Sequence, residues 1–187
     1  MTDKRIDDAR VSVRPLQRSD AAEIAAMNTR NRADIERVSP PQMASTFTAS
    51  GQTTRIEEIL RQCELGTRAY WTIRVDGDVA GDISLHAIQR GPVQDANVGY
   101  MVDAAFRGRG VATVALRLVV RSAFDELRLH RLEAGAMPSN LGSQRVLEKA
   151  GFTRVGLLRR HLFIGDTWQD HVLYEILGPD FIPAMWS

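Results

Sequence analysis

The chain has 187 residues, of which 44% are hydrophobic and 25% are charged, and its formal net charge is +1. This length and composition predict one globular domain with a sizeable core. The balanced charge argues against direct binding of nucleic acid or of a membrane surface through an overall field. No apolar run approaches the roughly 18 residues of a membrane span. The polar first ten residues lack the centre of a signal peptide, which predicts a cytoplasmic protein.

Residues 1–10 mix both signs of charge and are expected to form a flexible leader before a single domain over residues 11–187. Cys63 is the one cysteine, which excludes an intrachain disulfide and a cysteine-based metal cage. Its helical spacing from Ile59 and Leu60 favours packing over nucleophilic chemistry. The four histidines show no metal-ligand spacing, so no metal site is expected.

The first third of the chain predicts one strand and two helices. Val11–Leu16 alternates as a strand does, and Ser19 or Asp20 can cap the helix that follows. The segment 37–52 loses periodicity and predicts a long irregular loop, which with its flanking helices could form one wall of a substrate cleft, with a disordered segment as the alternative. Thr54 and Glu57 have the spacing of a capping box at the start of the second helix.

The remaining two thirds alternate between strands and helices. Asp76-Gly77 lies between two alternating runs and predicts a tight β-hairpin. Asn140 can cap a short helix that ends at Gly151. The other expected elements are a strand over 96–102, a helix from Val111, a strand over 129–137, and a final hairpin of 157–164 with 168–177.

The segment Val98–Leu116 reads as a strand, a loop with the sequence Arg107-Gly108-Arg109-Gly110, and a helix. Glycines at such a junction let backbone N–H groups approach a ligand, and a helix N-terminus favours anions. Arginines add donors suited to phosphate, although a solvated turn has the same composition. Thr113 replaces the third glycine of a dinucleotide fingerprint, and no Walker lysine follows. The pattern therefore predicts a phosphate or pyrophosphate site of another kind.

Three motifs together resemble the GNAT superfamily of acyl-CoA N-acyltransferases. They are Arg107-x-x-Gly110-x-Ala112, Asn140-x-x-Ser143 and the segment 146–152. The segments 129–134, 137–140 and 165–172 further resemble the RimJ/RimL branch of protein N-terminal acetyltransferases, and RimJ more than RimL. The resemblance implies an α+β fold in which helices flank a mixed, mostly antiparallel sheet.

The resemblance also implies that acetyl-CoA is the acetyl donor. The loop between strand and helix would hold its pyrophosphate, the preceding strand its pantetheine arm, and the start of the later helix the region near the sulfur. The residues that match these positions are Tyr100, Met101, Val102, Arg107, Gly108, Arg109, Gly110, Val111, Ala112, Thr113, Asn140 and Ser143.

Acetyl transfer needs a polarised carbonyl, a proton for the leaving thiolate and a base for the amine. The resemblance places a backbone N–H near Met101 or Val102 at the carbonyl and Ser143 at the thiolate, although Ser143 could simply bond to backbone. The RimL-type glutamate falls on Leu162, which cannot accept a proton. Glu133 is the alternative base, unless it is solvated or paired, and His161 and Asp170 follow as weaker candidates.

The acceptor remains open between three hypotheses. The first is the N-terminal α-amine of a protein, such as an alanine of a small-subunit ribosomal protein; the second is a small amine such as an aminoglycoside or peptide antibiotic. The third is a non-catalytic acetyl-CoA-binding module that associates with the ribosome and acts in its assembly or regulation. An α-amine with a pKa of about 7.8 is neutral in roughly one molecule in seven at pH 7, against about one in 2,500 for lysine, so it needs the weaker base. A monomer and a homodimer are equally compatible with the sequence.

Overall fold

The computed structural model describes residues 6–180, which form a seven-stranded sheet in the order β1-β2-β3-β4-β5-β7-β6. Every neighbouring pair is antiparallel except β4 and β5, so the expected mixed, mostly antiparallel α+β fold is confirmed. The strands are β1 (Val11–Pro15), β2 (Ala69–Val75), β3 (Asp78–Gln89), β4 (Asp95–Val102), β5 (Arg131–Ala136), β6 (Thr153–Ile164) and β7 (Thr167–Leu177). The α-helices are α1 (Ala21–Arg30), α2 (Arg32–Val38), α3 (Ala49–Glu64), α4 (Val111–Asp125) and α5 (Leu141–Ala150).

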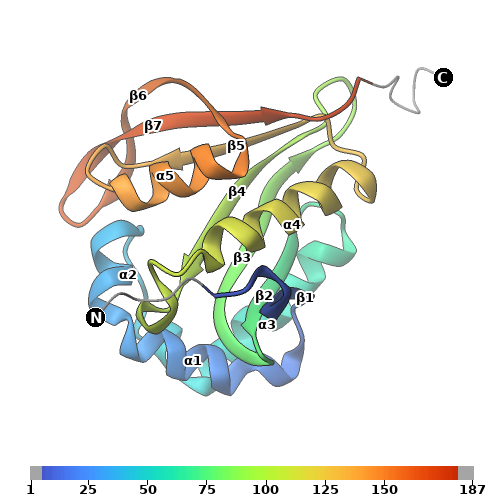
Figure 1. Cartoon of the computed structure of the whole chain (residues 1–187). Helices are drawn as coiled ribbons and strands as arrows, with labels where there is room; N and C mark the ends of the chain where they lie inside the picture. The colour runs from blue at the N-terminus through green and yellow to red at the C-terminus, as the bar shows by residue number, and fades with distance from the viewer. Residues whose placement is uncertain (1–5, 181–187) are drawn as a thin grey trace.

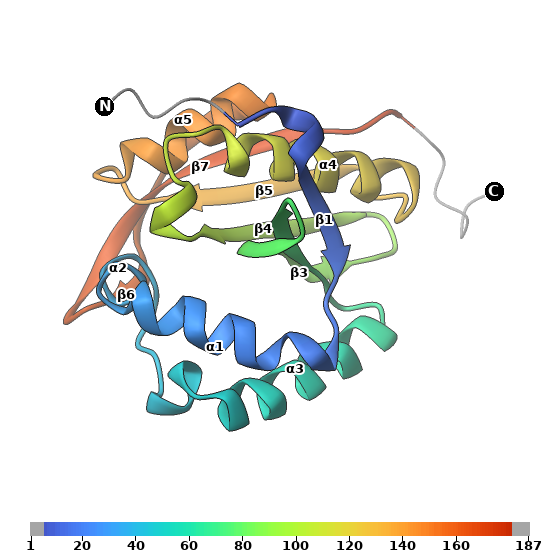
Figure 2. The same cartoon turned by 60° about the horizontal axis from the view of Figure 1, so that its bottom comes forward.

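The helices cover both faces of the sheet. Helices α4 and α5 lie on one face and α1 and α3 on the other, while α2 lies beside the β6–β7 hairpin (Figures 1 and 2). The larger buried cluster joins the sheet to α4 and includes Ile83, Leu116 and Leu132. A second cluster, which includes Ile24 and Ile56, packs α1 against α3. Burial of apolar area on both faces holds the layers together.

The parallel pairing of β4 with β5 is short. It runs from Asp95 opposite Arg131 to Asn97 opposite Glu133. Beyond these residues β4 continues to Val102 beside β3, and β5 continues to Ala136 beside β7. The two strands no longer pair with each other there, so each has backbone N–H and C=O groups directed toward the gap. Such groups need partners, and a bound ligand can supply them.

The hairpin and the two later helix boundaries match the sequence. Asp76 and Gly77 have φ of 52° and 95°, the left-handed values that a tight hairpin turn requires. Helix α4 begins at Val111 as expected. Asn140 Oδ1 accepts a hydrogen bond from Ser143 N over 3.1 Å and caps α5, which ends at Gly151 with φ of 101°. These predictions are confirmed.

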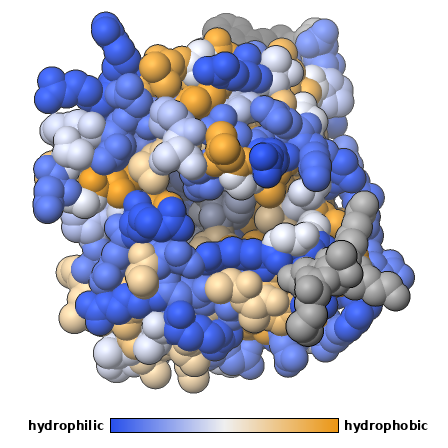
Figure 3. All heavy atoms as spheres, turned by 60° about the vertical axis from the view of Figure 1, so that its left-hand side comes forward, coloured by the Kyte–Doolittle hydropathy of each residue, from blue (hydrophilic) through white to orange (hydrophobic). Residues whose placement is uncertain are grey.

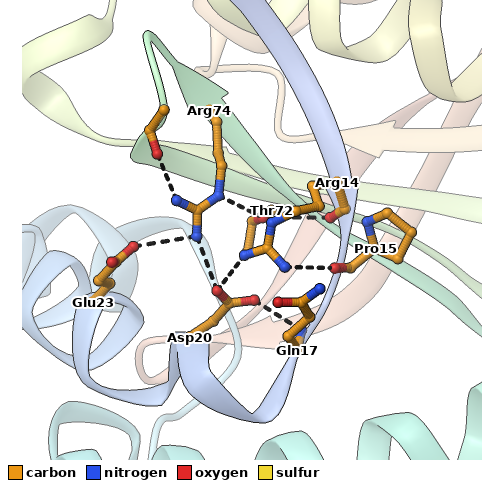
Figure 4. A network of polar contacts seen from close by, with 8 residues as sticks. Arg14, Pro15, Gln17, Asp20, Glu23, Thr72 and Arg74 are labelled. Carbon is orange, nitrogen blue, oxygen red and sulfur yellow. Dashed lines mark hydrogen bonds and ion pairs between the residues drawn. The ribbon is translucent and has the colours of Figure 1, made fainter.

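The predicted side-chain cap of α1 is wrong. Ser19 lies within a 3-10 turn, Arg18–Asp20, and Asp20 directs its carboxylate away from the N-terminus of the helix. Asp20 is buried, accepts a hydrogen bond from Gln17 N over 2.8 Å, and pairs with Arg14 and Arg74 (Figure 4). The carboxylate of Asp20 thus pairs with two arginines from β1 and β2 and not with the backbone N–H groups at the start of α1, because a buried charge needs charged partners.

The segment 37–52 is more regular than expected. It contains the end of α2 and a 3-10 turn, Ala44–Phe47, and α3 begins at Ala49. Thr48 caps α3 by accepting a hydrogen bond from Gly51 N over 3.1 Å, so the capping box expected at Thr54 is wrong. A Cβ on Gly51 would lie 2.1 Å from the carbonyl oxygen of Ser45, and this close approach of turn to helix explains the earlier start.

Part of the expected leader is packed. Ile6 is only 3% exposed, belongs to the larger core cluster, and donates its N–H to the carbonyl oxygen of Arg109 over 3.0 Å. Residues 1–5 and 181–187, with the predicted ends of leader and domain, lie outside the described residues. Between residues 6 and 180 no helix has the length and apolar character to cross a membrane. Cys63 packs against the second core cluster, as its spacing predicts.

Candidate active site

A cavity of about 640 Å³ opens where β4 and β5 separate. Its walls come from the ends of both strands, from the loop before α4, from the start of α5 and from α2. The face of the molecule that carries α2 and the β6–β7 hairpin is hollowed near its centre (Figure 3). The cavity thus joins segments that are far apart in the sequence, including all the motifs on which the GNAT resemblance rests.

The loop before α4 presents its backbone to the cavity. Gly108 and Gly110 have φ of 75° and 92°, in the left-handed region that favours glycine. Gly110 is the N-cap of α4, and the first intrahelical bond runs from Val114 N to Gly110 O over 3.1 Å. The three N–H groups before Val114 therefore have no partner inside the helix, and together with the helix dipole they suit an anion.

The two arginines of this loop differ in their surroundings. Arg107 lines the cavity, but its side chain is tied to α2: it forms an ion pair with Asp34, and Nε donates to the carbonyl oxygen of Val102 over 2.8 Å. Arg109 alone among the twelve predicted acetyl-CoA residues does not line the cavity. The geometry thus supports a pyrophosphate contact through backbone N–H groups more strongly than through Arg109.

Ser143 and Tyr100 form a hydrogen-bonded pair in the cavity wall. The hydroxyl of Tyr100 lies 2.9 Å from Ser143 Oγ and 3.3 Å from the Ser143 carbonyl oxygen. Burial raises the pKa of Tyr100 to about 12, so its hydroxyl keeps its proton near neutral pH. Asn140 caps α5 at Ser143 N and so fixes the backbone that carries the seryl hydroxyl. The pair can store and deliver a proton at the cavity surface.

The predicted bases lie outside the lining of this cavity. Glu133 accepts a hydrogen bond from Arg131 over 2.8 Å, and Arg131 also pairs with Glu175, so this carboxylate belongs to an ion-pair cluster on β5 and β7. His161 and Asp170 line a separate, shallow depression on the β6–β7 hairpin. The role of Glu133 stays a prediction that its placement does not favour.

The expected cleft wall at the segment 37–52 is confirmed in part, because Arg37 and Ser39 line the cavity. The sequence pattern predicted neither α2, whose first turn brings Asp34 to the same cavity, nor the contribution of β7. His171 lines the cavity from β7. The alternation of β7, with Val172 and Tyr174 buried in the core, could have placed His171 on the opposite face of the strand. It could not have revealed that this face borders the cavity.

A glycine loop with positive φ before a helix, and a parallel strand pair that opens into a cavity, match the arrangement expected for a GNAT acetyltransferase. Residues 10–153 match the family model described as Acetyltransferase (GNAT) domain. The chain belongs to this family and is an N-acetyltransferase.

Relatives at the level of sequence and structure agree. Probable N-acetyltransferase YjcK of Bacillus subtilis is 43% identical over 172 residues, covering 91% of this chain and 95% of that protein. The crystal structure of ribosomal-protein-S5-alanine acetyltransferase from Vibrio fischeri has a TM-score of 0.89 at 27% identity, covering 97% and 100% of the two chains. RimJ of Mycobacterium smegmatis in complex with CoA-disulfide has a TM-score of 0.86 at 28% identity, covering 89% and 81%. GNAT relatives therefore include proteins that bind CoA and proteins named for acetylating a ribosomal protein.

Proposed function

We propose that this enzyme transfers the acetyl group of acetyl-CoA to the N-terminal α-amine of a protein, for example an alanine of a ribosomal protein. The observation that carries the proposal is a continuous cavity that connects the glycine loop before α4, the separated ends of β4 and β5, and α2. A CoA-sized donor would extend from the loop before α4 to the gap between β4 and β5. The part of the cavity beside α2 then remains open for the acceptor. The Vibrio fischeri relative is an acetyltransferase for an alanine of ribosomal protein S5, and an alanine side chain has no nitrogen, which supports a main-chain amine as the acceptor here.

The residues of the cavity fit acetyl-CoA by chemistry. Backbone N–H groups of 111–113 and the glycines before them suit a pyrophosphate. The unpaired backbone edge of β4 beyond Asn97 suits the amides of a pantetheine arm, which can bond to a strand as a peptide does. A backbone N–H near Met101 or Val102 would polarise the thioester carbonyl.

The Tyr100–Ser143 pair would protonate the leaving thiolate. Ser143 Oγ donates its proton, and the Tyr100 hydroxyl, 2.9 Å away, replaces it. The carbon–nitrogen bond forms as the carbon–sulfur bond breaks, and this proton converts the thiolate into a thiol. A hydroxyl that stays protonated near neutral pH is suited to this part of the reaction.

Acetylation of a panel of acceptors tests the proposal. The panel contains peptides that begin with alanine or serine, the same peptides with a blocked N-terminus, an aminoglycoside and a polyamine. We expect mass spectrometry to find one acetyl group on the α-amine of the free peptides and none on the blocked ones, with stoichiometric release of CoA thiol. Acetylation confined to the small amines, or to lysine side chains of the blocked peptides, would overturn the proposal.

A further inference from the structure

His171 is a buried imidazole in the wall of the cavity. It lies on β7, is 4% exposed, and lines the cavity together with Gly135 of β5. A Cβ built on Gly135 would lie 3.5 Å from His171 Cδ2, so the ring lies directly over a residue that has no side chain to cover it. The ring therefore borders the gap between β4 and β5 where the acetyl group is expected.

The hydrogen bond of His171 defines its tautomer. Nδ1 lies 3.3 Å from the carbonyl oxygen of Gln169, and a carbonyl oxygen can only accept. Nδ1 therefore carries the proton, and Nε2 carries the lone pair. A backbone carbonyl that holds one nitrogen protonated leaves the other nitrogen as a base of fixed direction.

The charges around the ring keep it neutral. Burial is the main cause that lowers the pKa of His171, and His161 of β6 lowers it further. The Gln169 carbonyl and Asp170 oppose this shift, and Gly135 of β5 contributes no charge. Because burial lowers the pKa of His171 below its ordinary value, the neutral, proton-accepting form of the imidazole is favoured at neutral pH.

The ring also has a route to solvent. His161, which is exposed on β6, makes an edge contact with His171, with ring centroids 5.5 Å apart. A proton taken up by the buried ring can therefore leave through the exposed ring and a bridging water, because water-mediated bonds are nearly as favourable as direct ones. Glu133 has less freedom to act in this way, because Arg131 engages its carboxylate.

Resting on the α-amine acetyltransferase function proposed above, we propose that His171 is the general base of the reaction. Its Nε2 accepts the proton that a neutral acceptor amine loses as the amine nitrogen bonds to the acetyl carbon. The carbon–sulfur bond breaks in the same event, and the thiolate takes its proton from the Tyr100–Ser143 pair. The proton on His171 passes to solvent, and the hydroxyl pair recovers one from solvent, so the cycle closes without any other reactant.

The test compares His171→Gln with a matched control, His86→Gln. His86 is a half-buried imidazole whose pKa is also lowered by burial, but it lies on β3 and does not line the cavity. The acceptor is whichever member of the panel the wild-type enzyme acetylates. We expect His171→Gln to lower kcat/KM by about 100-fold, while calorimetry finds the acetyl-CoA affinity unchanged and His86→Gln stays within about twofold of wild type.

The pH profile separates a base from a structural residue. At pH values below the lowered pKa of His171, log(kcat/KM) of the wild type should rise by about two per pH unit, because both the amine and His171 must lose a proton. In His171→Gln the slope should fall to about one, which reports the amine alone. A variant that keeps the wild-type rate and slope would overturn the inference, as would Glu133→Gln producing this change while His171→Gln does not.

A measurement on the wild-type protein keeps the inference testable if His171→Gln fails to fold. NMR of protein labelled with ¹⁵N-histidine, with His171 identified by elimination using variants of the other three histidines, reports its tautomer directly. We expect a neutral ring with the proton on Nδ1 at pH 7. A charged ring, or a proton on Nε2, would overturn the inference. The choice of an α-amine as acceptor is tested separately, on the wild-type enzyme with the acceptor panel. The proposed acceptor and the proposed role of His171 can therefore fail independently.

Discussion

The two sides of the cavity are built from different kinds of structure. The proposed coenzyme side consists of β4, the loop 107–110 and the start of α4, which follow one another in the sequence and offer mainly backbone groups. The proposed acceptor side consists of α2 and His171, which are distant in sequence and offer side chains, with Gly135 leaving room for the imidazole. A site made of backbone is determined by local turns, whereas a site made of side chains depends on how the whole sheet packs.

Gly110→Asp tests the proposed coenzyme side, and we expect it to cause the largest loss of acetyl-CoA affinity. Gly110 has φ of 92°, where a residue with a Cβ is strained by about 1–3 kcal/mol. A carboxylate at the N-cap would also repel a pyrophosphate at the same N–H groups. We expect calorimetry to show a loss of acetyl-CoA affinity of at least about 100-fold, since 1.4 kcal/mol corresponds to tenfold.

Gly66→Asp is the matched control, because Gly66 also has a positive φ of 72° but follows α3, away from the cavity. It carries the same backbone strain and the same added charge. Equal losses of affinity in both variants would show that strain, and not the anion site, explains the effect of Gly110→Asp.

Ser143→Ala and Tyr100→Phe test the hydroxyl pair that lies between the two sides. We expect turnover to fall by about 10- to 100-fold in each, and the double variant to lose no more than the larger single loss, because the two hydroxyls act as a unit. Acetyl-CoA affinity should change little. Multiplicative losses in the double variant would contradict a shared proton path.

The pH dependence of the same pair is a separate prediction. Because burial raises the pKa of Tyr100 to about 12, deprotonation of Tyr100 should cause no loss of kcat between pH 7 and pH 10. Steady-state kinetics over this range, with Tyr100→Phe as the reference, measures it. A fall in kcat toward pH 10 that the wild type shows and Tyr100→Phe does not would contradict the prediction, because it would mean that the hydroxyl loses its proton at a lower pH.

The coenzyme side could be predicted from the sequence because its signals are local. Two glycines with a helix after them determine the direction of their own N–H groups, and Asn140 caps the helix that it precedes. The acceptor side could not be predicted in this way. Elsewhere in the fold, contacts between distant residues also decide the outcome: Asp20 pairs with Arg14 and Arg74 of two strands and not with the N-terminus of α1. The environment of His171 likewise depends on β5 and β6, which no local pattern specifies.

The ion pair of Arg107 with Asp34 joins the two sides of the cavity. Breaking it should produce the smallest change in acetyl-CoA affinity that we predict. The ion pair with Arg107, together with Arg37, holds the pKa of Asp34 below its ordinary value, so Asp34 is charged at neutral pH and holds the Arg107 guanidinium toward α2. Arg107→Ala should weaken acetyl-CoA binding by about tenfold, the loss of one charge-assisted hydrogen bond of about 1.5 kcal/mol. Asp34→Asn should instead strengthen binding by about two- to threefold, because it frees the guanidinium for the pyrophosphate.

A double-mutant cycle measured by calorimetry distinguishes competition from support. If Asp34 competes with the coenzyme for Arg107, Asp34→Asn has no effect once Arg107 is alanine. If Asp34 instead holds Arg107 in its binding position, Asp34→Asn weakens affinity nearly as much as Arg107→Ala does. Because Asp34 belongs to α2, the first result would mean that binding of the donor loosens the acceptor wall, and the acceptor should then bind after acetyl-CoA. Product-inhibition kinetics with CoA would read that order directly.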